Sequence, residues 1–140
     1  MNREPVALVV DDSPTVCKIV QLTLQRIHMK VIIARDGVTA LAEANSINDL
    51  DIIFLDIILP KMDGYSICHQ LRKNKKFVST PIIMLSGRDG FLDKMRGKLA
   101  GATEYLTKPF EAGELIHVVK QYVSVTASSG MPDAYQQRIR

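Results

Sequence analysis

Three short segments of the chain are hydrophobic at every position: Val6–Val10, Ile52–Leu55 and Ile82–Leu85. Uninterrupted runs of Val, Ile and Leu of this length are typical of strands that are covered on both faces, as in a parallel sheet. Two further segments, Val31–Ala34 and Glu104–Thr107, have a weaker strand pattern. The hydrophobic pattern therefore predicts five short strands.

Segments with hydrophobic residues at three- and four-residue intervals lie between the strands, which is the spacing of an amphipathic helix. The five predicted helices begin at Ser13-Pro14, after Asp36, near Tyr65, at Gly90 (ending near Ala100) and after Pro109. Ser before Pro is a favoured helix start, with Ser as the N-cap. The residues expected to face inward are Val16, Ile19, Val20, Thr23, Leu24, Ile27, Ala40, Leu41, Ala44, Ile47, Cys68, Leu71, Leu115, Val118, Val119 and Tyr122.

Strands that alternate with helices predict a parallel sheet with helices on both faces and right-handed crossovers. The expected fold class is α/β: a flavodoxin-like, doubly wound sheet of five strands in the order 2-1-3-4-5, with five helices. Residues 1–123 would form this domain. Residues 124–140 are rich in Ser, Ala, Gly and polar side chains, and we expect a flexible tail. The tail is too short for a second domain, so we expect no DNA-binding output domain.

The composition is that of a globular protein with a core, because 46% of the 140 residues are hydrophobic and 24% are charged. No hydrophobic run is long enough to cross a bilayer, and the N-terminus lacks a secretory signal, so we expect a cytoplasmic protein without membrane insertion. Cys17 and Cys68 have no metal-binding spacing and are expected to be reduced thiols that are buried or half-buried.

The net charge of +3 is too small to indicate a nucleic-acid partner, and we expect none. The densest basic run, Arg72 to Lys76, contains no aromatic residue. We interpret it as a solvated helix end, where cations suit the helix dipole.

Chemically reactive side chains follow four of the five predicted strands. Asp11 and Asp12 follow the first strand, Asp56 the third, Ser86 the fourth and Lys108 the fifth. Ligands of open α/β sheets bind at the carboxyl ends of the strands, where the strand order reverses, and here that point lies between the first and third strands. Each residue alone has an ordinary structural explanation, such as a helix cap or a solvated charge. Together they predict one polar crevice.

Three neighbouring carboxylates repel one another, and a hard divalent cation relieves the repulsion. Mg²⁺ is bound through few carboxylates, keeps several waters and commonly bridges to phosphate. A carboxylate can also act as a nucleophile and form an acyl phosphate, and phosphoryl transfer requires mainly positioning and positive charge. A lysine and a hydroxyl in the same crevice would stabilise the phosphoryl group. These residue types therefore favour Mg²⁺-dependent phosphorylation of an aspartate.

Four motifs make the chain resemble the receiver domain of two-component response regulators, of the single-domain chemotaxis-regulator type. They are Val9–Ser13, Leu55–Gly64, Pro81–Ser86 and Gly101–Phe110, and the resemblance extends over about Pro5–Val123. The segment from Leu85 to Lys98 and the first helix are further similar to the receivers of type IV pilus and twitching-motility chemotaxis systems. This resemblance implies a regulatory phosphoacceptor rather than an enzyme, one that catalyses its own phosphotransfer and dephosphorylation.

The resemblance also implies a role for each site residue. Asp56 would be the phosphoacceptor. Asp12, Asp56 and the Ile58 carbonyl would bind Mg²⁺ directly, and Asp11 would bind it through water. Lys108 and Ser86 would stabilise the phosphoryl group, and Ser86 and Tyr105 would form the switch. The Lys108–Pro109 bond would be cis, and Ile58 and Arg88 would border the attacking water and affect the phosphoryl lifetime.

The implied partners are a chemotaxis-type histidine kinase and a downstream protein. The downstream protein would bind the surface formed by the Gly90–Ala100 helix, the Glu104–Thr107 strand and the helix after Pro109. Phosphorylation would change the affinity of this surface by biasing an existing equilibrium. The protein would be a monomer or a weak dimer.

Two other functions share some of these features. A phosphatase of the haloacid-dehalogenase type uses an aspartate nucleophile, but its two aspartates are separated by one residue, whereas Asp11 and Asp12 are adjacent. A flavodoxin would need a phosphate loop after the first strand and aromatic walls, and the chain has no Trp. A P-loop between Gly90 and Lys98 is excluded because Leu99 stands where Ser or Thr is required. Phe91, Met95 and Leu99 are instead expected to be core or interface residues.

Overall fold

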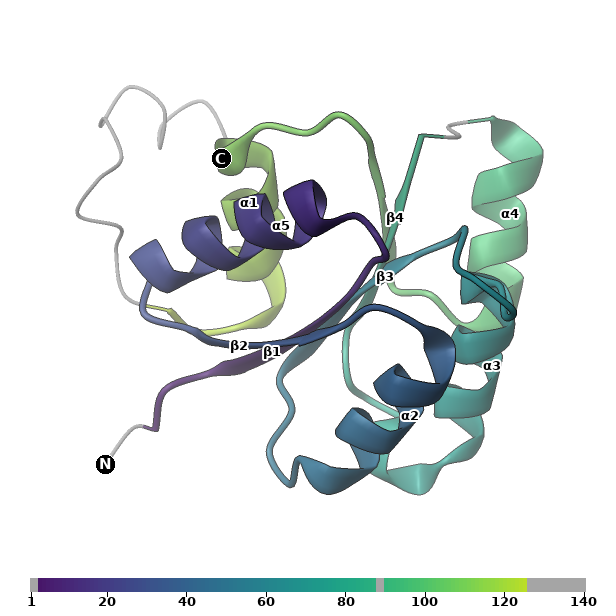
Figure 1. Cartoon of the computed structure of the whole chain (residues 1–140), viewed down its shortest axis with the longest axis horizontal. Coiled ribbons are helices and arrows are strands. Elements are labelled where there is room, and N and C mark those ends of the chain that lie inside the picture. The colour runs from purple at the N-terminus through teal and green to yellow at the C-terminus, as the bar shows by residue number, and fades with distance from the viewer. Residues whose placement is uncertain (1–2, 88–89, 126–140) are drawn as a thin grey trace.

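The computed structural model describes residues 3–87 and 90–125, which form one sheet covered by helices (Figure 1). Its strands are β1 (Val6–Val10), β2 (Lys30–Ala34), β3 (Ile52–Asp56), β4 (Ile82–Ser86) and β5 (Glu104–Thr107). All neighbouring strands pair in parallel, in the order β2-β1-β3-β4-β5. The predicted fold class and strand order are therefore confirmed.

The helices are α1 (Pro14–Arg26), α2 (Gly37–Ser46), α3 (Gly64–Lys73), α4 (Phe91–Ala100) and α5 (Ala112–Tyr122), with a short 3₁₀ helix, η1 (Lys75–Phe77). The two predicted N-caps are present. The Ser13 hydroxyl accepts a hydrogen bond from the Val16 amide at 3.2 Å, and the Asp36 carboxylate accepts one from the Thr39 amide at 2.7 Å. These caps satisfy amide groups that have no partner within the helix.

The helices cover both faces of the sheet, with α1 and α5 on one face and α2, α3 and α4 on the other (Figure 1). Alternate residues of the central strands therefore enter two separate cores. On β3, Ile53 and Leu55 pack towards α2 and α3, whereas Ile52 and Phe54 pack towards α1 and α5. Burial on both faces explains why these strands are hydrophobic at every position.

Two residues predicted to face inward, Ile19 and Tyr122, are exposed, which corrects the expectation. Ile19 is 48% exposed because α1 contacts its neighbours through a narrow stripe that contains Val20 and Leu24. Tyr122 is 38% exposed, and its hydroxyl donates a hydrogen bond to the Glu104 carboxylate. This hydrogen bond raises the pKa of Tyr122 to about 12.

Arg72 is not part of a solvated helix end, as we had expected from the basic run. Its half-buried guanidinium donates hydrogen bonds to the carbonyls of Gly101, Phe77 and Thr80 at 2.6 to 2.8 Å, and to the Thr103 hydroxyl at 3.1 Å. Burial lowers the pKa of Arg72. The side chain therefore connects the end of α3 to the loops before β4 and β5.

The α4 helix exposes residues that we had expected in the core or at an interface. Met95 is 41% exposed and Leu99 is 80% exposed, so neither is a core residue. The Phe91 side chain and Arg88 lie outside what the structure describes.

Three further features concern the thiols, the lengths of the helices and the C-terminal end of the described residues. Cys17 and Cys68 are both free and buried, as predicted. Within residues 3–87 and 90–125, no helix is long and apolar enough to span a membrane. Val125, the last described residue, still packs against the core beside Val123.

Candidate functional site

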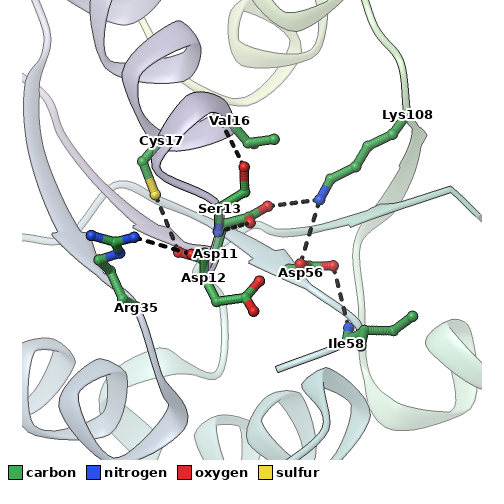
Figure 2. A network of polar contacts seen from close by, with 9 residues as sticks. All are labelled: Asp11, Asp12, Ser13, Val16, Cys17, Arg35, Asp56, Ile58 and Lys108. Carbon is green, nitrogen blue, oxygen red and sulfur yellow. Dashed lines mark hydrogen bonds and ion pairs between the residues drawn. The ribbon is translucent and has the colours of Figure 1, made fainter. Parts of the chain in front are cut away.

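The three predicted carboxylates lie together at the carboxyl edge of the sheet. One oxygen from each of Asp11, Asp12 and Asp56 lies within 4.8 Å of the others. Because β1 and β3 are adjacent parallel strands, the residues that end them or follow them meet at this edge (Figure 2). Asp11 is fully buried, Asp56 is 7% exposed and Asp12 is open to solvent. The sheet therefore presents an acidic cluster with one open side.

Lys108 reaches this cluster from the end of β5. Its ammonium nitrogen lies 2.7 Å from Asp11 Oδ2 and 3.4 Å from Asp56 Oδ2 (Figure 2). The Lys108 amide donates to the Ser86 carbonyl at 2.7 Å, which ties β5 to the end of β4. The bond from Lys108 to Pro109 is cis. One cation is thus held between two carboxylates that are 45 residues apart in sequence.

Backbone amides orient two of the carboxylates. The Ser13 amide donates to Asp11 Oδ1 at 2.9 Å, and the Ile58 amide donates to Asp56 Oδ1 at 3.2 Å. Both donors lie two residues after their acceptor, in the turn that follows a strand. These turns hold Oδ1 of each carboxylate, while Oδ2 of each faces the Lys108 ammonium.

The pKa values of Asp56 and Lys108 are both raised in this environment. Desolvation and the negative charge of Asp11 raise the pKa of Asp56, although Lys108 opposes the shift. Burial acts to lower the pKa of Lys108, but the hydrogen bond to Asp11 and the nearby Asp56 charge outweigh it and raise the pKa. Lys108 therefore remains an ammonium, and Asp56 carries a charge that the protein stabilises poorly.

Ser86 and Tyr105 lie on the neighbouring strands β4 and β5. Ser86 ends β4 and is 2% exposed. Tyr105 is half-buried on β5, facing α4: a Cβ added to Gly97 would lie 3.6 Å from its ring. Ile58, after β3, exposes 62% of its surface. The other residue that we expected to border the attacking water, Arg88, lies outside the described residues.

Three residues support the site that the sequence analysis did not single out. Arg35, directly after β2, donates to the Asp12 carbonyl at 3.2 Å, and the Cys17 thiol donates to the Asp11 carbonyl at 3.2 Å. Gly64 packs so closely that an added Cβ would lie 2.2 Å from the Asp56 carbonyl oxygen. Arg35 could have been found from its position after a strand that borders the first. The contacts of the other two depend on the packing of α1 and α3.

The donor set suits a hard divalent cation. Three carboxylates with one open side provide oxygen ligands and leave room for the waters that Mg²⁺ retains. The adjacent Lys108 balances only part of the negative charge, because it is one cation beside three carboxylates. The residues present therefore fit a magnesium site.

Comparison with known proteins identifies the family. Residues 7–120 match the family model of the response regulator receiver domain. The chain is 42% identical over 116 residues to Protein PilG of Pseudomonas aeruginosa, covering 83% of this chain and 85% of PilG. The chain also matches several transcriptional regulators, but it spans only 41–48% of the length of each.

Solved structures show the same fold. The chemotaxis response regulator CheY4 of Vibrio cholerae superposes with a TM-score of 0.82 and 33% identity, covering 86% of this chain and 100% of that chain. The receiver domain of sensor histidine kinase PA1611 from Pseudomonas aeruginosa PAO1 has a magnesium ion coordinated in its active-site cleft. It superposes with a TM-score of 0.79 and 28% identity, covering 86% and 98% of the two chains. The chain therefore belongs to the response regulator receiver domains of two-component systems.

Proposed function

We propose that Asp56 accepts a phosphoryl group from a chemotaxis-type histidine kinase in a Mg²⁺-dependent reaction. The observation that supports this most strongly is the cluster of Asp11, Asp12 and Asp56, in which one oxygen from each carboxylate lies within 4.8 Å of the others. The Lys108 ammonium lies beside Asp11 and Asp56. Of the three, Asp56 lies at the end of β3 and has a raised pKa caused by desolvation and by Asp11. A bound divalent cation would relieve this repulsion and would offset the negative charge of the incoming phosphoryl group.

Asp12, Asp56 and the Ile58 carbonyl are the proposed direct ligands of Mg²⁺, and Asp11 the ligand that acts through water. When bound, Mg²⁺ supplies positive charge against the phosphoryl oxygens. The open side of the cluster at Asp12 supports this assignment, because it leaves space for waters and for the phosphoryl donor.

In the proposed transfer, a carboxylate oxygen of Asp56 attacks phosphorus of the kinase phosphohistidine. The P–N bond breaks, the electron pair leaves with the imidazole, and an acyl phosphate remains on Asp56. Lys108 would stay with the transferred group and neutralise its oxygens, and Ser86 would donate a hydrogen bond to it. Attack by water would later release phosphate and restore the carboxylate. The protein would thus regulate by carrying the group and would catalyse its own dephosphorylation.

The switch would follow from the added charge, which is roughly −1.5 to −2 for a phosphoryl group at neutral pH. Ser86 would move towards this charge, and Tyr105 would repack in the space between β5 and α4. The hydrogen bond from the Lys108 amide to the Ser86 carbonyl supports this coupling, because it joins the ends of β4 and β5 directly. The surface of α4, β5 and α5 would then bind a downstream protein with changed affinity.

We extend the proposal to control of pilus-based motility or taxis. The support is the sequence resemblance to receivers of twitching-motility systems and the similarity to Protein PilG. The proposed organisation is a cytoplasmic receiver domain over residues 1–123 and a tail over 124–140, present as a monomer or weak dimer. Exposed Ile58, with Arg88, would set the lifetime of the acyl phosphate by bordering the attacking water.

The test is phosphotransfer from a radiolabelled chemotaxis-type histidine kinase to the full chain. We expect label to appear on the wild type with MgCl₂ and to disappear with EDTA or with Asp56→Asn. Asp63→Asn is the matched control, because Asp63 is an exposed N-cap in the same loop, and this variant should accept label. Label on Asp56→Asn, or labelling that does not depend on Mg²⁺, would contradict the proposal.

A further inference from the structure

Asp12 differs from the other two carboxylates of the acidic cluster in what holds its side chain. The Asp11 carboxylate accepts a hydrogen bond from the Ser13 amide at 2.9 Å. The Asp56 carboxylate accepts one from the Ile58 amide at 3.2 Å. Within residues 3–87 and 90–125, the Asp12 carboxylate forms neither a hydrogen bond nor an ion pair. The direction of this carboxylate therefore depends on the backbone that carries it.

The Asp12 backbone is held from the side of β2. The Asp11 amide donates to the Ala34 carbonyl at 3.1 Å, which extends the parallel pairing of β1 and β2 by one residue. Arg35 is the next residue after β2, and this pairing places it beside the turn that follows β1. Its guanidinium donates a hydrogen bond to the Asp12 carbonyl at 3.2 Å (Figure 2). Arg35 is thus the side chain that restrains the Asp12 peptide group.

The loop that carries Arg35 is itself held in place. The Asp36 carboxylate accepts a hydrogen bond from the Thr39 amide at 2.7 Å and caps α2. A Cβ added to Gly37 would lie 2.9 Å from the Met62 sulfur, so the start of α2 packs closely against the loop after β3. The Arg35 side chain therefore extends towards Asp12 from a loop with little freedom to move.

We propose that Arg35 is a positioning residue for Mg²⁺ binding. Its hydrogen bond would hold the Asp12 peptide group so that the Asp12 carboxylate keeps one oxygen within 4.8 Å of those of Asp11 and Asp56. Loss of a group that orients a metal ligand from outside the ligand set commonly weakens metal binding about 10- to 100-fold. The inference rests on the proposed function, because it concerns the same metal site.

The charge of Arg35 distinguishes positioning from a purely electrostatic role. A guanidinium beside the cluster repels Mg²⁺, so removal of its charge alone would strengthen Mg²⁺ binding. Loss of positioning would weaken the binding instead, because the Asp12 carboxylate would no longer be held towards the cluster. Lys61 provides a matched control for charge. It is an exposed cation that lines the same pocket of about 520 Å³ as Arg35, and it forms no hydrogen bond to Asp12.

The test is a titration of the full chain with MgCl₂, followed through the amide signals in two-dimensional NMR spectra. Arg35→Met should weaken Mg²⁺ binding about tenfold. Arg35→Lys keeps the charge and a shorter donor, and it should weaken the binding less. Lys61→Met should bind Mg²⁺ as tightly as the wild type or slightly more tightly. Because the altered side chains are exposed, signals from residues far from the site should stay unchanged in every variant.

A double variant shows whether Arg35 acts through Asp12. Asp12→Asn alone should weaken Mg²⁺ binding, and the addition of Arg35→Met should then cause no further loss. The same loss from Arg35→Met with and without Asp12→Asn would overturn the inference. Equal weakening by Lys61→Met and Arg35→Met would also overturn it.

The proposed function and this inference fail in different ways. A wild type that binds no Mg²⁺ would contradict the proposed metal site and the inference with it. Wild-type binding that Arg35→Met leaves unchanged or strengthens would contradict the positioning role of Arg35 alone.

Discussion

The Lys108 ammonium and the Asp11 carboxylate lie 2.7 Å apart, and the Asp11 side chain has no exposed surface. Lys108 itself keeps 22% of its side chain exposed. The cation therefore closes one side of a buried anion while remaining reachable from the crevice. This arrangement makes the stability of the fold and the chemistry of the site depend on the same contact.

Replacing Lys108 with Met should destabilise the protein by about 3 kcal/mol, because a buried carboxylate would lose its charged partner. Urea denaturation without divalent cations measures the change. Addition of MgCl₂ should recover part of the loss, since a cation would again balance Asp11. Lys120→Met is the control, because Lys120 is exposed on α5, and it should leave the free energy of unfolding nearly unchanged. Equal stability of the two variants would show that the Lys108–Asp11 contact contributes little.

Asp56→Asn should stabilise the metal-free protein at neutral pH. The pKa of Asp56 is raised by desolvation and by Asp11, so the folded state binds the Asp56 proton more tightly than the unfolded chain does. The ionised form therefore costs stability above the folded-state pKa, and this cost disappears as the pH falls through that pKa. The stability difference between variant and wild type, measured by thermal melting in EDTA, should shrink towards acidic pH.

Magnesium should reverse this ranking. A ligand that binds only the folded state at 100 times its Kd stabilises it by about 2.7 kcal/mol, and the wild type offers one carboxylate more than Asp56→Asn. Melting curves recorded across a MgCl₂ titration give the comparison. An equal response of both proteins to Mg²⁺ would argue against Asp56 as a ligand.

Two glycines provide opposite predictions. Gly64→Ala should destabilise the protein by about 3 kcal/mol or more, because the new Cβ would lie 2.2 Å from the Asp56 carbonyl oxygen and the acceptor loop would have to shift. Gly97→Ala should be neutral or stabilising by up to about 1 kcal/mol, because its Cβ would find only ordinary contacts, at 3.6 Å or more, within a helix. Chemical denaturation of both variants tests the pair, and a tolerated Gly64→Ala would contradict the close packing at Asp56.

Arg72 should be more important to stability than any other cation of its basic run. Arg72→Ala removes hydrogen bonds to three carbonyls and one hydroxyl, and a hydrogen bond to a charged group contributes about 1.5–3 kcal/mol. We expect a loss of about 3 kcal/mol in urea denaturation, and little rescue by Arg72→Lys, because an ammonium cannot reproduce the planar fork. The exposed neighbour Lys73, changed to Ala, should have almost no effect.

The strands and the acidic cluster could be predicted from the sequence because both depend on local information. Hydrophobic runs define β1, β3 and β4, and parallel pairing brings the residues after them to one edge, so Asp11, Asp12 and Asp56 meet whatever the details of packing. The role of Arg72 could not be predicted in this way. Its acceptors are three backbone carbonyls and one hydroxyl, up to 31 residues away, and nothing in the basic run distinguishes Arg72 from Lys73.

The exposure of individual helix residues could also not be predicted from the hydrophobic pattern of the sequence. Ile19 follows the helical spacing of α1 but lies outside the stripe that contacts the core. Leu99 has the same apolar character as a core residue and is 80% exposed. Which part of an amphipathic face is covered depends on how far the neighbouring helix extends, and that is set by tertiary packing.

The central claim is that Asp56 carries the phosphoryl group, and intact-mass spectrometry tests it most directly. The full chain is incubated with acetyl phosphate and MgCl₂, and wild type, Asp56→Asn and the control Asp63→Asn are compared. We predict that wild type and Asp63→Asn gain the mass of one phosphoryl group and that Asp56→Asn gains none. The same phosphoryl adduct on Asp56→Asn, or none on the wild type, would contradict the account.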